Sequence, residues 1–448
     1  MKTYQDLMEL TMESDRMQFC YNAINEYKTS ELYKNAYEGD KYARQQNVTI
    51  TNYRKLLYTM SGKAVADNYT ANHKCASNFF SRFMIQRNQS LLGNGVSFND
   101  EATKEKLGGA EFDYKVVEAG ENALTMGVSY GFMNLDHIEV FSALEFVPLW
   151  DEETGALRGG IRYWQIDAKK PLRATLYEED GYTEYIKRKG EDIAILTEKR
   201  AYKLIANSSV ALGTEIVGGE NYEGFPIVPL WANAKHQSEL IGMKENIDCY
   251  DLIKSGFAND LDDASMIYWT INNAGGMDDI DLAKFVERMR TVKASVIDDD
   301  GASAQAHTMD VPYQSREAYL KILEDDLYAD AMALNTDRIA GGNNTATAIQ
   351  ASYEPLNSAL DRYEYQVTKF IKGLMKLIGV DDEPIYKRSR ITNQAEETQM
   401  ILSASEYLDN ETILKHLPFL SVDEIEGILD RTTKEEAERF ANGVDDAE

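Results

Sequence analysis

One apolar stripe near the C-terminal end constrains the fold of this chain more than any other feature. Its members are spaced alternately four and three residues apart: Ile349, Tyr353, Leu356, Leu360, Tyr363, Val367, Phe370, Leu374 and Leu377. Residues with this spacing lie along one face of an α-helix. The sequence therefore predicts a single helix over residues 346–379, about 50 Å long at 1.5 Å per residue, with a kink at Pro355.

Two shorter amphipathic segments flank a small insert upstream of this helix. The first carries Leu240, Met243, Ile247, Tyr250, Ile253, Phe257 and Leu261 on one face, and the second carries Leu320, Leu323 and Leu327. We expect helices over 237–264 and 314–333, and an α/β insert over 265–313 with a strand, a helix and a hairpin turning at residues 298–301. The two helices would form a stalk whose apolar faces need a partner, either each other or a neighbouring subunit.

The remaining segments predict an α+β fold. The first 127 residues read as mostly helical, and residues 128–230 contain short strands separated by turn dipeptides such as Asp180-Gly181, which is typical of an antiparallel sheet. Residues 334–345 are rich in Gly and Asn and break the helical pattern. The tail, 380–448, begins with a predicted strand over 384–391 and ends in short acidic helices.

Charge and cysteine content narrow the class of protein. The chain has 448 residues with 47 Lys+Arg against 75 Asp+Glu, a formal net charge of −28. This balance argues against a protein that grips nucleic acid, because neutralising phosphates needs clustered Lys and Arg. Mean hydropathy is −0.45 and no long apolar run predicts a membrane span or a signal peptide. Three widely spaced cysteines fit a reducing cytoplasm, so the composition predicts a soluble, intracellular protein.

The motifs predict no catalytic residue, no cofactor site and no metal site. Ser61-Gly62-Lys63 lacks the rest of a phosphate loop, and none of the five histidines has the spacing of a zinc protease motif. One alternative stays open, a metal-dependent nuclease or hydrolase that uses the carboxylates of Asp260, Asp262, Asp263 and Asp298. A second alternative is a scaffold protein in which the long helix forms coiled-coil bundles of two to four chains.

Several patches, taken in order, resemble the portal proteins of tailed bacteriophages, in the branch typical of long-tailed phages. They start with residues 122–132 (NALTMGVSYGF), 146–151 (FVPLWD) and 159–164 (GGIRYW), and continue with 224–233 (GFPIVPLWAN), 248–255 (DCYDLIKS), 341–348 (GGNNTATA) and 412–419 (TILKHLPF). The resemblance runs from about residue 37 to residue 431. At residues 345 and 346 this chain has Thr-Ala where the family usually shows Ser-Gly.

The resemblance implies a portal-type subunit whose segments have the family's names. These are a mixed α/β wing (1–236, β-rich over 128–230), a two-helix stem (237–264 and 314–333), a clip (265–313), a tunnel loop (334–345), a long kinked wing helix (346–379) and a helical crown (380–448). It further implies a ring, usually of twelve subunits, at one capsid vertex of the virion, with assembly in the host cytoplasm. The implied partners are double-stranded DNA read without sequence specificity, the terminase large subunit, the head–tail adaptor, and the major capsid and scaffolding proteins. No membrane is implied.

Carried over by position, the resemblance assigns two sets of residues. The tunnel loop would line the DNA channel with Asn335, Asp337, Arg338, Gly341, Gly342, Asn343, Asn344 and Thr345. The stem would pack through Leu240, Met243, Ile247, Tyr250, Phe257, Leu320, Leu323 and Leu327. For a DNA channel, the acidity of the chain is no argument against a nucleic-acid partner. A channel wall of carboxylates and amides lets a polyanion slide through without binding it tightly.

Overall fold

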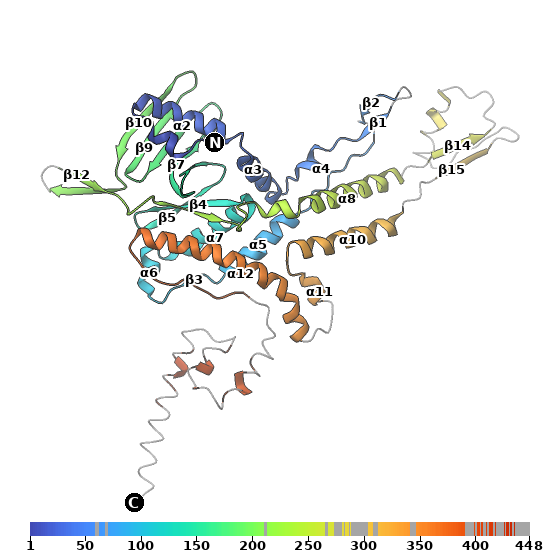
Figure 1. Ribbon diagram of the computed structural model, residues 1–448. Coiled ribbons are helices and arrows are strands. Elements are labelled where there is room, and N and C mark those ends of the chain that lie inside the picture. The colour runs from blue at the N-terminus through green and yellow to red at the C-terminus, as the bar shows by residue number, and fades with distance from the viewer. Residues whose placement is uncertain are drawn as a thin grey trace, which may run out of the picture.

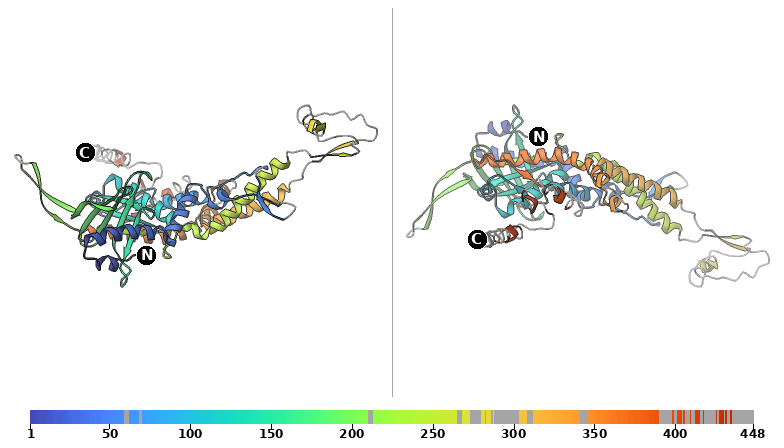
Figure 2. Two further views of the ribbon diagram at one scale, coloured as in Figure 1. Left: turned by 90° about the horizontal axis from the view of Figure 1, so that it is seen from above. Right: turned by 90° about the horizontal axis from the view of Figure 1, so that it is seen from below.

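The computed structural model describes residues 1–58, 62–67, 70–209, 213–264, 268–272, 280–281, 283–285, 287, 303–307, 312–340 and 346–389, with isolated positions between 398 and 434. Helices and antiparallel sheets together form a body, and a pair of helices leaves that body as a stalk (Figures 1 and 2). The chain is thus of mixed helix and sheet composition, as the sequence predicts.

The larger sheet is a five-stranded antiparallel meander in the order β10-β9-β8-β7-β6. Its strands are β6 (Phe146–Trp150), β7 (Leu157–Trp164), β8 (Leu172–Glu178), β9 (Gly181–Lys187) and β10 (Ile193–Arg200). Helices α1 (Tyr4–Met8) and α2 (Glu13–Tyr27) cover one face of it. The sequence did not predict β10, because its Ile-Ala-Ile-Leu run is followed by four polar residues and lacks alternation.

The smaller sheet has the order β13-β4-β5, with β4 (Val128–Asn134), β5 (His137–Ser142) and β13 (Ile227–Trp231). The first six residues of β4 are all buried, so β4 shows no period of two, and the sequence did not predict it. A separate two-stranded ribbon, β11 (Lys203–Ser209) with β12 (Gly213–Glu220), projects from the body (Figure 1).

The helices that surround these sheets come mainly from the first 126 residues. They are α3 (Glu31–Ala43), α4 (Val48–Asn52), α5 (Phe79–Leu92), α6 (Glu101–Lys106) and α7 (Ala110–Met126). Between α4 and α5 the structure contains a small hairpin, β1 (Leu56–Tyr58) with β2 (Ala64–Ala66). The sequence did not predict this hairpin, since its strands have only three residues each.

The long apolar stripe is buried within the chain itself. Helix α12 runs from Ala346 to Leu377 with Pro355 inside it, and all stripe positions from residue 353 to residue 374 are at most 7% exposed. The stripe joins one core with α5, α7, β4 and β13. The contact is close: a Cβ at Gly131 of β4 would lie 2.5 Å from the Phe370 ring, and one at Gly373 would lie 2.7 Å from Val228 of β13.

This packing contradicts the hypothesis that the apolar stripe of α12 forms coiled-coil bundles between chains. A coiled coil needs the stripe at the surface, where a second helix can cover it. Here the chain's own sheet and helices cover it, so little of the stripe is left to bind another copy.

The insert and the tail are described only in part. β14 (Tyr268–Asn272) pairs antiparallel with β15 (Ser303–His307), whereas the sequence predicted that residues 292–297 pair with 302–311; residues 292–297 lie outside the described residues. In the tail, β16 (Ile385–Tyr386) pairs with β3 (Val96–Ser97), within the predicted strand. Most of residues 390–448 lie outside the described residues. Among the helices that are described, none has both the length and the apolar character needed to cross a bilayer.

Candidate functional site

The candidate site is the stalk and the turn at its base, because the sequence placed its functional residues there. The stalk consists of a 3-10 turn η1 (Glu239–Gly242), helix α8 (Lys244–Ala264) and helix α10 (Tyr313–Asp330), which lies beside α8 (Figure 1). Helix α8 begins at Lys244, later than the predicted residue 237, and Leu240 belongs to η1.

The predicted stalk residues differ in burial along its length. Those nearest the body, Leu240, Met243, Ile247, Leu323 and Leu327, are at most 4% exposed, whereas Tyr250, Phe257 and Leu320 are half-buried. Tyr250 meets Phe79 of α5 edge-on, with ring centroids 5.0 Å apart, so α5 supplies part of the packing expected between the two stalk helices. Leu261 is 53% exposed, and its predicted place on a buried apolar face is wrong.

A second stripe of α8 is buried, and it is polar. Asp251, Ser255 and Asn259 are spaced four residues apart and are 0%, 3% and 7% exposed. The apolar periodicity that predicts α8 gives no indication of this stripe, because it locates only the apolar face of the helix. The signal that indicates it is the spacing of four, which places the three side chains on one line along the helix.

The partner of this stripe is an extended segment, residues 70–78, which precedes α5. Three backbone amides of this segment donate to the three side chains in order: Ser77 N to Asp251 Oδ1 at 2.8 Å, Cys75 N to Ser255 Oγ at 2.9 Å, and His73 N to Asn259 Oδ1 at 2.6 Å. Two extended residues span roughly 6.6 Å and four helical residues about 6.0 Å. The near-equal steps let every second amide meet every fourth side chain, so the segment is fastened along α8.

Asp251 has a further bond inside the protein. Its Oδ2 accepts from Asn47 Nδ2 at 2.5 Å. Burial raises the pKa of Asp251 above the ordinary value of 3.8, against the opposing effect of its bonds to Asn47 and Ser77. The carboxyl group is therefore held in place by hydrogen bonds in an environment that disfavours its charge.

This raised pKa predicts how stability depends on pH. A carboxyl group whose pKa is raised by folding contributes its full stabilisation below its ordinary pKa, here 3.8. That stabilisation is lost as the pH rises through the folded-state pKa of Asp251. The free energy of unfolding of the wild type minus that of Asp251→Asn should therefore fall across this window and stay constant above it. Urea unfolding of both proteins at a series of pH values measures this difference in unfolding free energy. A difference that rises with pH would contradict a raised pKa of Asp251.

One turn earlier, α8 is fastened by Asp248. Its carboxylate accepts from the Tyr42 hydroxyl at 2.5 Å and from Thr49 Oγ1 at 2.6 Å. Burial, followed by this bond to Asp248, raises the pKa of Tyr42. Residues 42–49 and 70–78 thus both hold the first helix of the stalk against the body.

The base of the stalk leads into the predicted tunnel loop. Part of this loop is helical: α11 (Thr336–Ala340) follows α10, which differs from the loop expected over 334–345. Asn335 caps α11, since its Oδ1 accepts from the backbone amides of Asp337 at 3.1 Å and Arg338 at 3.4 Å. The predicted Gly341, Gly342, Asn343, Asn344 and Thr345 lie outside the described residues.

Arg338, the cation predicted in this loop, is paired. Its guanidinium forms an ion pair with Asp325 of α10, and the side chain is exposed. Leu334 ahead of α11 is tied to α5, because Gln86 exchanges two hydrogen bonds with its backbone at 2.9 and 3.0 Å. The described part of the loop thus has an anchored start and a cation whose charge is balanced locally.

The acidic residues proposed for a nuclease do not assemble where they are described. Asp260 forms an ion pair with Arg316 of α10, and Asp262 lies 2.5 Å from His73 Nε2. The side chain of Asp263 and all of Asp298 lie outside the described residues. Over the described ranges, no group of three or more His, Cys, Asp or Glu is arranged to hold a metal ion.

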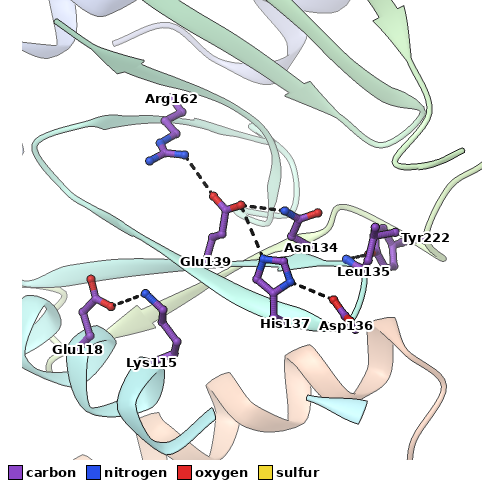
Figure 3. Close-up of polar contacts among 9 residues, drawn as sticks. All are labelled: Lys115, Glu118, Asn134, Leu135, Asp136, His137, Glu139, Arg162 and Tyr222. Atoms are coloured by element: carbon purple, nitrogen blue, oxygen red, sulfur yellow. Dashed lines mark hydrogen bonds and ion pairs between the residues drawn. The ribbon is translucent and has the colours of Figure 1, made fainter. Parts of the chain in front are cut away.

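Figure 3 shows a polar cluster on the body, at the turn between β4 and β5. Glu139 accepts from Asn134 Nδ2 at 2.8 Å and from Arg162 Nη1 at 3.2 Å, and His137 lies 3.0 Å from Asp136. The Tyr222 hydroxyl accepts from the amide of Leu135 at 2.9 Å, where φ is +58°. These contacts match the charges with one another and stabilise a strained turn, which is a structural role.

Comparison with known proteins gives one family. The family model described as "Phage portal protein, SPP1 Gp6-like" matches residues 19–441. The portal protein of Clostridium phage phiCD119 is 27% identical over 321 residues, which cover 69% of this chain and 66% of that protein. The portal protein of Bacillus phage SPP1 is 23% identical over 458 aligned residues, covering 94% of this chain and 88% of that protein.

A solved structure titled as the virion of a native gene transfer agent particle contains a chain that is similar at 12% identity and a TM-score of 0.44, over 77% of this chain and 90% of that chain. The family model covers nearly the whole sequence. The chain therefore belongs to the SPP1 Gp6-like family of phage portal proteins.

Proposed function

We propose that copies of this protein form a closed ring at one vertex of a phage capsid, and that double-stranded DNA passes through its axial channel during packaging and ejection. Membership of the portal family supports this role, and the observation that carries it is the stalk. The chain leaves the body along α8 and comes back along α10, which lies beside α8, to reach α11 (Figures 1 and 2). A ring of such stalks forms a tube with the body as its outer collar.

In this proposal the segments have the roles that the resemblance implies. Residues 1–236 and 346–379 are the wing, 237–264 and 314–333 the stem, 265–313 the clip, 334–345 the tunnel loop and 380–448 the crown. The clip is the docking site of the terminase large subunit and later of the head–tail adaptor, and the wing meets the major capsid and scaffolding proteins. The ring has twelve subunits, the protein acts in the virion after assembly in the host cytoplasm, and its role is structural with no catalysis.

Electrostatics favour a channel that does not retain DNA. The net charge is −28, and the cation Arg338 is already paired with Asp325. Each phosphate held by a free Lys or Arg would add a barrier to movement and would make binding depend steeply on salt. A tunnel loop in which Arg338 is already paired with a carboxylate would therefore bind DNA phosphates weakly.

Two measurements test the function together. Purified protein viewed by negative-stain electron microscopy should show closed rings with a central hole. Titration of a fluorescent 30-base-pair duplex should give binding weaker than about 10 µM at 150 mM salt, in the range of non-specific contacts. Tight binding at this salt concentration, or bundles of two to four chains at every protein concentration, would overturn the proposal.

A further inference from the structure

The C-terminal half of helix α12 has one exposed face, and this face is basic. From residue 362 to residue 376 the exposed side chains are spaced alternately three and four residues apart: Arg362, Tyr365, Lys369, Lys372 and Lys376. This spacing places them along one line of the helix, away from the apolar stripe that joins the core. Four of them are cations and none is a carboxylate, in a chain with 75 acidic and 47 basic residues. We call these four cations the basic face.

Most of the charge on the basic face is not balanced by the described part of the chain. Lys372 pairs with Glu383 at 2.5 Å, whereas the other three cations form no ion pair with the described residues. The two carboxylates beside this face, Asp361 and Glu364, both pair with Arg388, at 2.6 and 2.7 Å. The neighbouring anions are thus already paired, and three cations remain available to a partner.

The helix dipole does not account for the basic face. Cations stabilise a helix through its dipole only when they lie within its last turn, and Lys376 is the one cation of α12 in that turn. Arg362 lies about 21 Å from Lys376 along the helix axis. The remaining cations therefore have no role in ending the helix.

The turn after β13 extends the positive surface beside α12. Lys235 of this turn and Arg362 line the same groove, and Lys235 is exposed. Burial, and then the charge of Lys369, lowers the pKa of His236 in the same turn. Lys369 is therefore close enough to disfavour another positive charge there, and the local potential is positive although the chain as a whole is acidic.

The chemistry of the basic face fits a nucleic-acid backbone better than a protein. Lysine is depleted in protein–protein interfaces, whereas protein–DNA interfaces are polar and positively charged. One strand of B-DNA has a phosphate roughly every 3.4 Å along the axis, so a face about 21 Å long spans about six phosphates of one strand. Lysine presents a point charge on a flexible stem, which suits contact with phosphates without reading of the bases.

The net charge of −28 does not prevent such a contact. At 0.1 M salt, exposed charges more than about 10 Å apart are largely screened from each other. DNA lying on α12 therefore responds mainly to the cations next to it. The site is also separate from the tunnel loop, because Arg362 lies about 24 Å along α12 from its first residue, Ala346.

We propose that the basic face of α12 binds the phosphate backbone of double-stranded DNA without sequence specificity, at a site on the wing that is separate from the tunnel loop. This inference rests on the function proposed above, in which DNA is the partner, and it names residues that contact this DNA. With four cations the contact is weak at physiological salt, in agreement with the affinity expected above.

Binding of a fluorescent 30-base-pair duplex to the purified protein tests the basic face. Four phosphate contacts predict a slope of about −3.6 for log affinity against log salt concentration, so the affinity should fall about fifty-fold between 50 and 150 mM salt. In Arg362→Gln/Lys369→Gln/Lys372→Gln/Lys376→Gln the affinity at 50 mM salt should fall at least about tenfold, and most of the salt dependence should disappear. Glutamine has nearly the helix propensity of Lys and Arg, so the circular dichroism spectrum should not change.

A control variant removes the same number of positive charges elsewhere. Lys169→Gln/Lys170→Gln/Arg173→Gln/Lys189→Gln changes four exposed cations in or beside the turns that follow β7 and β9. Its net charge equals that of the basic-face variant, so it should bind the duplex as the wild type does. An equal loss of affinity in both variants would show that binding follows net charge, and it would overturn the proposal.

Two further measurements separate DNA from other partners of the basic face. If the wild type binds poly-L-glutamate through this face and does not bind the duplex at 50 mM salt, the partner is an acidic protein and the proposal is wrong. The basic-face variant should form the same rings as the wild type in negative stain, and loss of its rings would place the face between subunits and overturn the proposal as well. A wild type without rings would count against the proposed function alone, because duplex binding by the basic face is measured independently of assembly.

Discussion

Replacing Phe370 with alanine should lower the free energy of unfolding by about 3–5 kcal/mol, the usual loss for a buried aromatic residue. Phe370 is 1% exposed, lies in the middle of the α12 stripe and fills the space left by Gly131 on β4. The strand cannot move in to fill the cavity, because β4 is the central strand between β13 and β5. Urea unfolding followed by circular dichroism measures the loss.

The same variant separates packing within a chain from packing between chains. If the stripe served as a seam between copies, the loss would depend on protein concentration; within one chain it should be the same at every concentration. Tyr365→Ala is the matched control, since Tyr365 is on the same helix and is 68% exposed. It should change stability by no more than about 0.5 kcal/mol. An equal loss in both variants would contradict the packing described.

Replacing Asp251 with alanine should cost about 2–3 kcal/mol. The change leaves the Asn47 amide and the Ser77 N–H buried without their acceptor, and a buried donor without a partner loses its full solvation. The loss is moderated because burial already disfavours the charged form of this carboxyl group. Thermal or urea unfolding at pH 7 measures the change.

Amide hydrogen exchange shows where in the structure the Asp251→Ala substitution weakens hydrogen bonding. In Asp251→Ala the Ser77 amide should exchange faster than the Cys75 amide, which retains its bond to Ser255. The control is Asp262→Ala on the same helix, where the carboxylate is 53% exposed and pairs with His73; an exposed pair of this kind contributes at most about 1 kcal/mol. If Asp262→Ala proved as costly as Asp251→Ala, the fastening of residues 70–78 would not depend on the buried stripe.

The stalk shows which structural features a local sequence pattern can predict and which it cannot. Periodic apolar residues predicted α8 and α10, because helical periodicity is a property of neighbouring residues. The same reasoning placed Leu261 on the apolar face, which is wrong because this side chain is 53% exposed, and it gave no sign that Asp251 is buried. What buries Asp251 is a segment about 175 residues earlier in the chain, and no spacing along α8 contains that information. Similarly, β4 has no alternation because both of its faces are covered by distant elements.

By itself, the sequence determined where the long helix runs, that two amphipathic helices flank an insert, that residues 128–230 form antiparallel strands, and that the chain is strongly acidic. The order of these parts also indicated the portal family. Only the tertiary structure decided that the chain's own sheet covers the α12 stripe and that a buried polar stripe of α8 binds residues 70–78. The reason is physical: periodicity and charge are local to a segment, whereas the surface that buries a residue comes from contacts between segments far apart in the chain.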